Sequence, residues 1–428
     1  MIEKRDGRQV QYDPEKIKAA VLKAFMAVDK KVSPYALEKA DNIADYVTNI
    51  YNEKLKLGVN LTVEETQDLV EHGLMACKRK DVARAYITYR NQRTAERDRK
   101  NKTMQIAKKN LTKGNDDKQN ANVDAHSFGG RVGEAMSAVT KQIALDEYVS
   151  PTARYNHLHN IVYIHDLDAY VVGSHNCLTI PFDDLLANGF NTRQTDVRPA
   201  NSINTAFQLV AVIFQLQSLQ QFGGVSASHL DWTMVPYVRK SFYKHLKDGI
   251  KYLQVPYKTK ALDGRPPEVD SDHSENTPIE NWKPYVHEAI YGYAMDMTQR
   301  ELDQAVEGMY HNLNTLQSRS GNQLPFTSIN YGSCTLPEGR MVIKALLDGC
   351  KKGVGKFHRT SIFPCGIFQL GKGINRKPGD PNYDLFRLAL EVTGQRIYPN
   401  YASLDWSGNA GYDKNDPRTY FSTMGLVA

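Results

Sequence analysis

Cysteine is scarce in this sequence of 428 residues, and its placement excludes two structural uses of the residue. No two cysteines form a CxxC pair, and none has the spacing of zinc ligands. We therefore expect neither a disulfide framework nor a metal site in this chain, and we expect reduced thiols. The five cysteines are Cys77, Cys177, Cys334, Cys350 and Cys365.

Long apolar runs are also missing. No stretch approaches the roughly 20 apolar residues of a membrane-spanning helix. The first residues, MIEKRDGRQV, lack the apolar core of a signal peptide. We therefore expect a cytoplasmic protein without a membrane partner. The formal net charge of +6 is modest, and the basic residues lean towards the N-terminal part. Such a charge suits binding of phosphates or nucleotides, and it is equally typical of a solvated basic surface.

Several catalytic signatures are absent as well. The sequence has no P-loop, no GxGxxG dinucleotide motif and no serine-hydrolase pattern. His157, His159 and His165 have no set of cysteines or carboxylates at ligand spacing, so we interpret them as capping or half-buried side chains rather than metal ligands. His165 and the neighbouring Asp166 can orient a loop by hydrogen bonding.

The length and the patterns that are present indicate more than one domain. A chain of 428 residues exceeds the size at which a single core usually stops growing. Residues 1–95 have the pattern of a small helical domain fronted by a hairpin, with a DG turn within residues 2–12. Asp13 caps a first helix that begins with proline. Thr62 opens a second helix with a capping box, and a third helix covers residues 83–90.

Three basic residues of this first domain are expected to lie near one another. Lys4 and Arg5 on the first strand and Lys16 in the first helix would place cations beside a helix N-terminus, which suits a polyphosphate. Three such residues are also typical of ordinary surface. The order KRDGR, YDPEKI and AYITYRNQR resembles the ATP-cone, a regulatory domain of many ribonucleotide reductases. This resemblance implies that Lys4, Arg5 and Lys16 contact the effector, with ATP activating and dATP inhibiting the enzyme.

The next two segments differ sharply in composition. Residues 96–122 are rich in Lys, Asn, Asp and Gln with almost no apolar periodicity, and we interpret them as a linker with a frayed helical start. From residue 123, helical and strand patterns alternate, which predicts an α/β layered or barrel-like domain with a parallel component. We expect helices over 133–148, 206–221, 230–253, 282–317 and 339–351, and strands over 161–164, around Cys177, within 321–332 and within 361–370.

One apolar run contains a thiol at a break in the backbone pattern. The segment SIFPCGIFQL has Pro364 and Gly366 on either side of Cys365. Proline and glycine predict a strand or buried loop that turns sharply at the cysteine, and such a turn can present a side chain into a cavity. A free cysteine in an apolar run is also typical of a small residue buried in the core.

Five segments together resemble the catalytic subunit of the anaerobic, class III ribonucleoside-triphosphate reductase. The resemblance implies an α/β barrel of ten strands, with a central loop that carries the active-site cysteine at its tip. It implies that Cys365 is the thiyl radical that removes the 3'-hydrogen of the ribose, and that Cys177 donates hydrogen from the opposite face. Cys77, Cys334 and Cys350 match no catalytic motif. The five segments are HNCL, GNQLPFTSINYG, SIFPCGIFQL, DPNYDLFRLAL and YPNYASLDWSGNAGYDKNDPRTYFSTMG.

The resemblance also implies partners. The substrate would be a ribonucleoside triphosphate, the reductant formate or a thiol protein, and the activating partner a radical S-adenosylmethionine protein. The family is homodimeric. The sequence has no helix-turn-helix or zinc finger, so we expect no direct nucleic-acid partner.

The sequence departs from the family at its last residues, STMGLVA. In the family a further domain follows, with a four-cysteine zinc site and a glycine that carries the stable radical. We therefore expect residues 123–428 to form an incomplete barrel, from a gene interrupted as in phages. Such a chain would be active only with a complementing C-terminal segment. The alternative is a catalytically inactive remnant that still binds nucleotides.

Overall fold

The computed structural model describes residues 2–3, 9–112, 127–173, 175, 177–221, 223–253, 273–318, 323–406, 413, 415–420 and 422–424. The chain divides into two compact units, Met1–Ile106 and Ala107–Ala428. Within the described ranges, no helix is both long and apolar enough to cross a membrane. The five cysteines are all free thiols.

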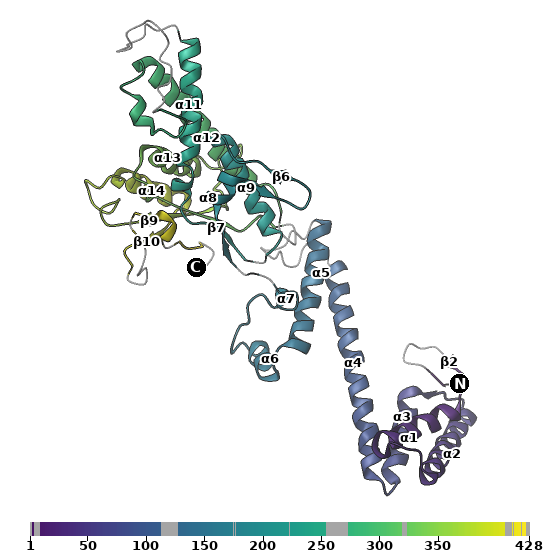
Figure 1. Cartoon of the computed structure of the whole chain (residues 1–428). Coiled ribbons are helices and arrows are strands. Elements are labelled where there is room, and N and C mark those ends of the chain that lie inside the picture. The colour runs from purple at the N-terminus through teal and green to yellow at the C-terminus, as the bar shows by residue number, and fades with distance from the viewer. Residues whose placement is uncertain are drawn as a thin grey trace. The chain divides into compact units, whose positions relative to one another are not determined.

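The first unit is a helical domain with a small sheet, drawn in purple and blue in Figure 1. Its sheet has the order β2-β1-β3, with β1 antiparallel to β2 and parallel to β3. The strands are β1 Ile2–Glu3, β2 Gln9–Val10 and β3 Leu61–Thr62, and the helices are α1 Pro14–Asp29, α2 Pro34–Lys56, α3 Val63–Ala76 and α4 Lys80–Thr112.

Two predicted helix starts of the first unit are confirmed. The Asp13 side chain accepts a hydrogen bond from the amide of Glu15, the second residue of α1. Thr62 and Glu65 exchange the two hydrogen bonds of a capping box at the start of α3. Strand β1 pairs antiparallel with β2, as the predicted hairpin requires. The predicted DG turn at Asp6 and Gly7 lies outside the described residues.

The segment that we interpret as a linker, residues 96–122, is more ordered than its composition indicates. Helix α4 continues without interruption to Thr112, so its first part is regular helix and not a frayed start. Lys, Arg and Gln are good helix formers even where no apolar face is buried. Residues 113–126 lie outside the described ranges.

The second unit is an α/β domain built on one parallel sheet. The sheet has the order β10-β9-β8-β7-β4, and each neighbouring pair runs parallel. The strands are β4 Leu178–Thr179, β7 Val225–Ala227, β8 Thr327–Tyr331, β9 Cys365–Leu370 and β10 Asn400–Ser403. The α/β class is therefore confirmed. The expected closure of ten strands into a barrel stays a prediction.

Long helices connect these strands, as a parallel sheet requires. Short helices and a separate two-stranded sheet, β5 Phe190–Asn191 with β6 Asp196–Val197, lie between them along the chain. The helices are α5 Phe128–Ile143, α6 Pro151–Leu158, α7 Leu167–Tyr170, α8 Phe182–Asn188, α9 Ile203–Ser218, α10 Leu230–Thr233, α11 Val235–Tyr252, α12 Glu288–Leu313, α13 Pro337–Lys352 and α14 Tyr383–Arg396.

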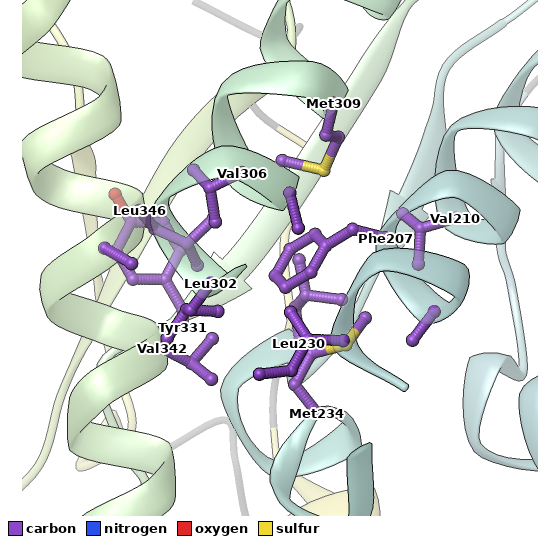
Figure 2. Close-up of a cluster of buried hydrophobic side chains, with 14 of the residues drawn as sticks. Phe207, Val210, Leu230, Met234, Leu302, Val306, Met309, Tyr331, Val342 and Leu346 are labelled. Atoms are coloured by element: carbon purple, nitrogen blue, oxygen red, sulfur yellow. The ribbon is translucent and has the colours of Figure 1, made fainter. Parts of the chain in front are cut away.

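One face of the parallel sheet is apolar and lies against the helices. Side chains alternate between the faces of a strand, and Ile329, Tyr331 and Phe368 fall on the same face. They join the main hydrophobic core. Helix α12 packs against α9, α11 and α13. Figure 2 shows side chains from α9, α12, α13 and β8 meeting in one cluster that includes Phe207 and Leu302.

Two strand predictions for the second unit are corrected. Residues 161–164 form no strand, and Ile161 and Val162 are exposed, because four apolar residues gain little in an extended conformation without a neighbouring strand. Cys177 lies just before β4, not inside it. Helix α12 begins at Glu288, six residues later than predicted, after a short 3₁₀ turn at Ile279–Trp282.

Candidate active site

The second face of the parallel sheet carries buried polar side chains. Ser226 on β7, Ser328 and Asn330 on β8 and Gln369 on β9 lie on this face. All four are at most 1% exposed. Burying an unpaired polar group costs free energy, so these side chains need partners. We call these four residues the polar face.

Asn330 makes the central hydrogen bonds of the polar face. Its Nδ2 donates to Ala227 O at 2.9 Å and to the backbone oxygen of Thr423 at 3.0 Å, and it lies 3.2 Å from Ser226 Oγ. Its Oδ1 accepts from the amide of Thr423 at 3.1 Å. The segment Ser422–Met424 is therefore bound across this face by a residue from the middle of the sheet.

Gln369 links the polar face to groups beyond the carboxyl ends of the strands. Its Nε2 donates to the backbone oxygen of Ser228 at 3.2 Å. The Ser228 hydroxyl lies 2.7 Å from His229 Nδ1, and His229 Nε2 lies 2.8 Å from a carboxylate oxygen of Asp183. Burial raises the pKa of Asp183, but the hydrogen bonds from His229 and Thr233 outweigh burial and leave the pKa below its ordinary value.

Cys365 is the first residue of β9 and is buried, with 2% exposure. It follows a cis Phe363-Pro364 bond and pairs in register with Ser328. The expectation of a loop tip is therefore corrected: hydrogen bonding to the neighbouring strands holds this segment within the sheet. Burial raises the pKa of the thiol, and a hydrogen bond to the Tyr398 hydroxyl, 3.5 Å away, lowers it in part.

Cys177 is exposed and precedes β4, the edge strand next to β7. Thr179, Ser226, Ser328 and Cys365 form one row across four strands. Both candidate thiols thus lie at the amino end of the same sheet. Because strands in a sheet are about 4.8 Å apart, the three intervals between β4 and β9 correspond to about 14 Å. The sheet does not bring the two thiols onto neighbouring strands.

The three histidines considered as metal ligands make local contacts. His157 Nδ1 accepts from the amide of Ile164 at 3.1 Å, and His159 Nδ1 lies 2.8 Å from Tyr155 O. His165 contacts Asp166 at 2.7 Å. Across the part of the chain that the structure describes, no group of three or more His, Cys, Asp or Glu side chains could hold a metal ion.

The candidate effector site of the first unit is described only in part. Lys4 and Arg5 lie outside the described residues, and Lys16 is an exposed side chain 3.5 Å from Asp13 at the start of α1. One turn further along α1, Ala20 lines a cavity of about 400 Å³. The remaining lining residues come from α3 and α4: Gln67, Tyr86, Tyr89, Arg90, Arg93, Glu96 and Arg97.

The charge of this cavity is partly neutralised from within. Arg90 forms ion pairs with Glu64, Asp68 and Glu71. Arg93 pairs with Glu96 and stacks over Tyr89, with the guanidinium carbon 5.5 Å from the ring centroid. The cavity therefore combines aromatic surface, for a base, with guanidinium groups, for phosphate.

Sequence reasoning missed the polar face and most of this cavity. The alternation in TSINY places Ser328 and Asn330 on one face of a strand, and this signal could have revealed a polar face. The segment AYITYRNQR was used only for its resemblance to the ATP-cone, although Tyr86, Tyr89 and Arg90 within it line the cavity. No local signal connects Asn330 with Thr423, because they are 93 residues apart.

The protein is thus built of two units, a helical unit followed along the chain by a larger α/β unit with a parallel sheet. Residues 119–425 match the anaerobic ribonucleoside-triphosphate reductase family, and residues 1–95 match the ATP cone domain. The chain therefore belongs to the anaerobic ribonucleoside-triphosphate reductase family.

Individual relatives agree with this assignment. The chain is 27% identical over 405 residues to the anaerobic ribonucleoside-triphosphate reductase of Haemophilus influenzae, a match that covers 94% of this chain and 52% of the relative. It is 29% identical over 286 residues to the enzyme of Enterobacteria phage T4, covering 67% of this chain and 42% of that one. The chain spans about half the length of the curated relatives it matches.

A solved structure is also similar. The anaerobic ribonucleotide reductase from Thermotoga maritima, in complex with dATP and CTP, has a TM-score of 0.44 and 13% sequence identity. The match covers 72% of this chain and 48% of that one.

Proposed function

We propose that this chain takes part in the anaerobic reduction of ribonucleoside triphosphates to deoxyribonucleoside triphosphates for DNA synthesis, under allosteric control by ATP and dATP. The observation that carries the proposal is the family match over residues 119–425, joined in one chain to an ATP cone match over residues 1–95. Residues 1–95 are proposed as the regulatory domain and residues from 123 onwards as the catalytic domain.

Thiol chemistry suits this reaction. The 2'-carbon of ribose is a poor electrophile, so removing its hydroxyl is easier from a radical at the 3'-carbon. In the proposal Cys365 is the thiyl that removes the 3'-hydrogen, and Cys177 donates hydrogen as the 2'-hydroxyl leaves as water. The burial of Cys365 supports a role that needs protection from water and stray reductants. Because Cys365 on β9 and Cys177 before β4 are not on neighbouring strands, the role of each thiol is tested separately.

The proposal includes partners for this chemistry. A radical S-adenosylmethionine activase would generate the radical, and formate would supply the electrons. A segment supplied in trans is proposed to carry the glycyl radical and the zinc site. We also propose a homodimer.

The effector is proposed to bind the first unit between the N-terminus of α1 and the cavity on α4. Lys16 and the α1 N-terminus favour the phosphates. Tyr89 and Arg93 offer a stacking surface for the base. Lys4 and Arg5 complete the proposed phosphate contacts.

The test is an assay of CTP reduction under strict anoxia. It combines the 428-residue chain with activase, S-adenosylmethionine, formate and ATP, with and without the separately expressed C-terminal segment from the same genome. We expect deoxycytidine triphosphate only when the segment is present. Added dATP should suppress the formation of deoxycytidine triphosphate.

Cysteine variants test the two thiols individually. Cys177→Ser and Cys365→Ser should each abolish turnover, whereas Cys77→Ser should not. Full activity in Cys365→Ser would show that this thiol is a core residue and that another cysteine reacts. If no condition gives turnover but ATP binding is retained, the chain is a catalytically inactive remnant that binds nucleotides.

A further inference from the structure

The backbone of Thr423 is bound by a side chain in the manner of a neighbouring strand. In a sheet, a residue donates through its N–H and accepts through its C=O. At Thr423 the backbone N–H and C=O both bind the side-chain amide of Asn330. The N–H donates to Asn330 Oδ1 at 3.1 Å, and the C=O accepts from Asn330 Nδ2 at 3.0 Å. Ser226 Oγ lies 3.4 Å from the same carbonyl oxygen.

The anchor of this contact is rigid. Asn330 lies in β8 between β7 and β9 and is fully buried. Its amide also donates to the backbone oxygen of Ala227 on β7, at 2.9 Å. The orientation of the side chain is thus fixed by the sheet, and Thr423 must take up the register that this orientation allows.

We propose that Asn330 is a positioning residue that fixes the segment Ser422–Met424 across the polar face. The two hydrogen bonds set both the position and the direction of the segment. This inference rests on the proposed function for its catalytic consequence. The pair of hydrogen bonds between Asn330 and Thr423, which we call the clamp, can be measured without turnover.

Asparagine is suited to this role because one side chain both donates and accepts. Asn330→Asp keeps the acceptor for the Thr423 N–H but removes the donor. Asn330→Leu removes both and keeps a similar volume. A loss of protection at Thr423 that is partial in Asn330→Asp and larger in Asn330→Leu would distinguish a clamp from general packing.

The experiment is hydrogen–deuterium exchange of the 428-residue chain, followed by mass spectrometry of the peptide that contains Thr423. In Asn330→Leu this peptide should exchange about tenfold faster or more, since the loss of two hydrogen bonds releases the segment. Asn330→Asp should lie between this variant and the parent chain. The amides of β8 and β9 should keep their protection.

A second buried asparagine provides the matched control. Asn375 is also fully buried, and it donates to Gly332 O at 3.0 Å and Gln369 O at 2.8 Å without contacting Thr423. Asn375→Leu should leave the Thr423 peptide unchanged. Thr423→Pro approaches the clamp from the other side, because it removes the N–H while leaving the sheet intact, and it should release Ser422 and Met424 even if Asn330→Leu does not fold.

The outcomes separate the clamp from the proposed function. Unchanged exchange in Asn330→Leu, or equal acceleration in Asn375→Leu, would overturn the clamp. In the complemented assay Asn330→Asp should lower kcat with little change in KM. A parent chain that shows no turnover, yet loses protection of Thr423 on substitution of Asn330, would refute the proposed function and leave the clamp standing.

Discussion

The sulfur of Cys365 lies 3.5 Å from the phenolic oxygen of Tyr398, within hydrogen-bonding distance, at the buried amino end of β9. Burial raises the pKa of this thiol, and the contact with Tyr398 lowers it only in part. Cys365 is therefore protonated at neutral pH. A protonated thiol is a poor nucleophile but can still give up a hydrogen atom, so hydrogen-atom chemistry remains open to Cys365 while nucleophilic catalysis is disfavoured.

This environment predicts a ranking of thiol reactivity. With a thiol-specific chromogenic reagent in native buffer, Cys177 should react fast because it is exposed, whereas Cys334, Cys350 and Cys365 should react only after unfolding. Burial raises the pKa of Cys350 to about 11. Loss of the fast phase in Cys177→Ser is the control, and fast modification of Cys365 in the native chain would contradict its burial.

The main core predicts a large effect of one aromatic side chain. Phe207 is 1% exposed and lies at the centre of the cluster in Figure 2. Phe207→Ala should lower the free energy of unfolding of the second unit by about 3–5 kcal/mol, as judged by urea denaturation. Phe357 is 71% exposed, and Phe357→Ala should change stability by less than about 0.5 kcal/mol. Similar losses in both variants would argue against the placement of Phe207 in the core.

A buried pair between α11 and α12 predicts a pH-dependent stability. His245 Nε2 lies 2.7 Å from a carboxylate oxygen of Glu301, and the Ser241 hydroxyl donates to the other oxygen at 3.0 Å. Burial raises the pKa of Glu301, but the hydrogen bonds from His245 and Ser241 outweigh it and leave the pKa below its ordinary value of 4.5. The unfolded chain therefore binds this proton more readily than the folded chain does.

Because the pKa of Glu301 is lowered by folding, its contribution is complete at neutral pH and is lost as the pH falls below 4.5 towards the lower folded value. Glu301→Gln should cost about 1.5–3 kcal/mol at pH 7. The difference from the parent chain should shrink in urea denaturation at about pH 4, where an ordinary glutamate is largely protonated. A difference that is equal at both pH values would show that the charge of Glu301 contributes nothing.

The proposed effector site predicts a contrast between two lysines of the first unit. Lys16 lies in the first turn of α1, where a helix favours anions, and Lys56 lies in the last turn of α2, where a helix disfavours them. In isothermal titration with ATP, Lys16→Ala should weaken binding by roughly three- to tenfold. Lys56→Ala should have no effect. Equal weakening in both variants would indicate nonspecific attraction to a basic surface.

The predictions that were confirmed concern local interactions. The caps at Asp13 and Thr62 form between residues two or three positions apart, so the sequence contains both partners. The apolar run after Pro364 becomes the buried strand β9 because its length and composition fit a strand covered on both sides. The prediction at residues 161–164 was wrong because a short apolar run acquires a strand conformation only with a partner strand.

The amino-acid sequence by itself determined the α/β class, the helix caps at Asp13 and Thr62 and the membership in a reductase family, because periodicity, capping and motifs are carried by neighbouring residues. Only the tertiary structure decided which side chains share the polar face. Ser226 and Thr423 are 197 residues apart, and Asn330 and Thr423 are 93 apart. Their meeting follows from the order and register of the parallel strands, which are set by packing of the whole second unit and by no local pattern.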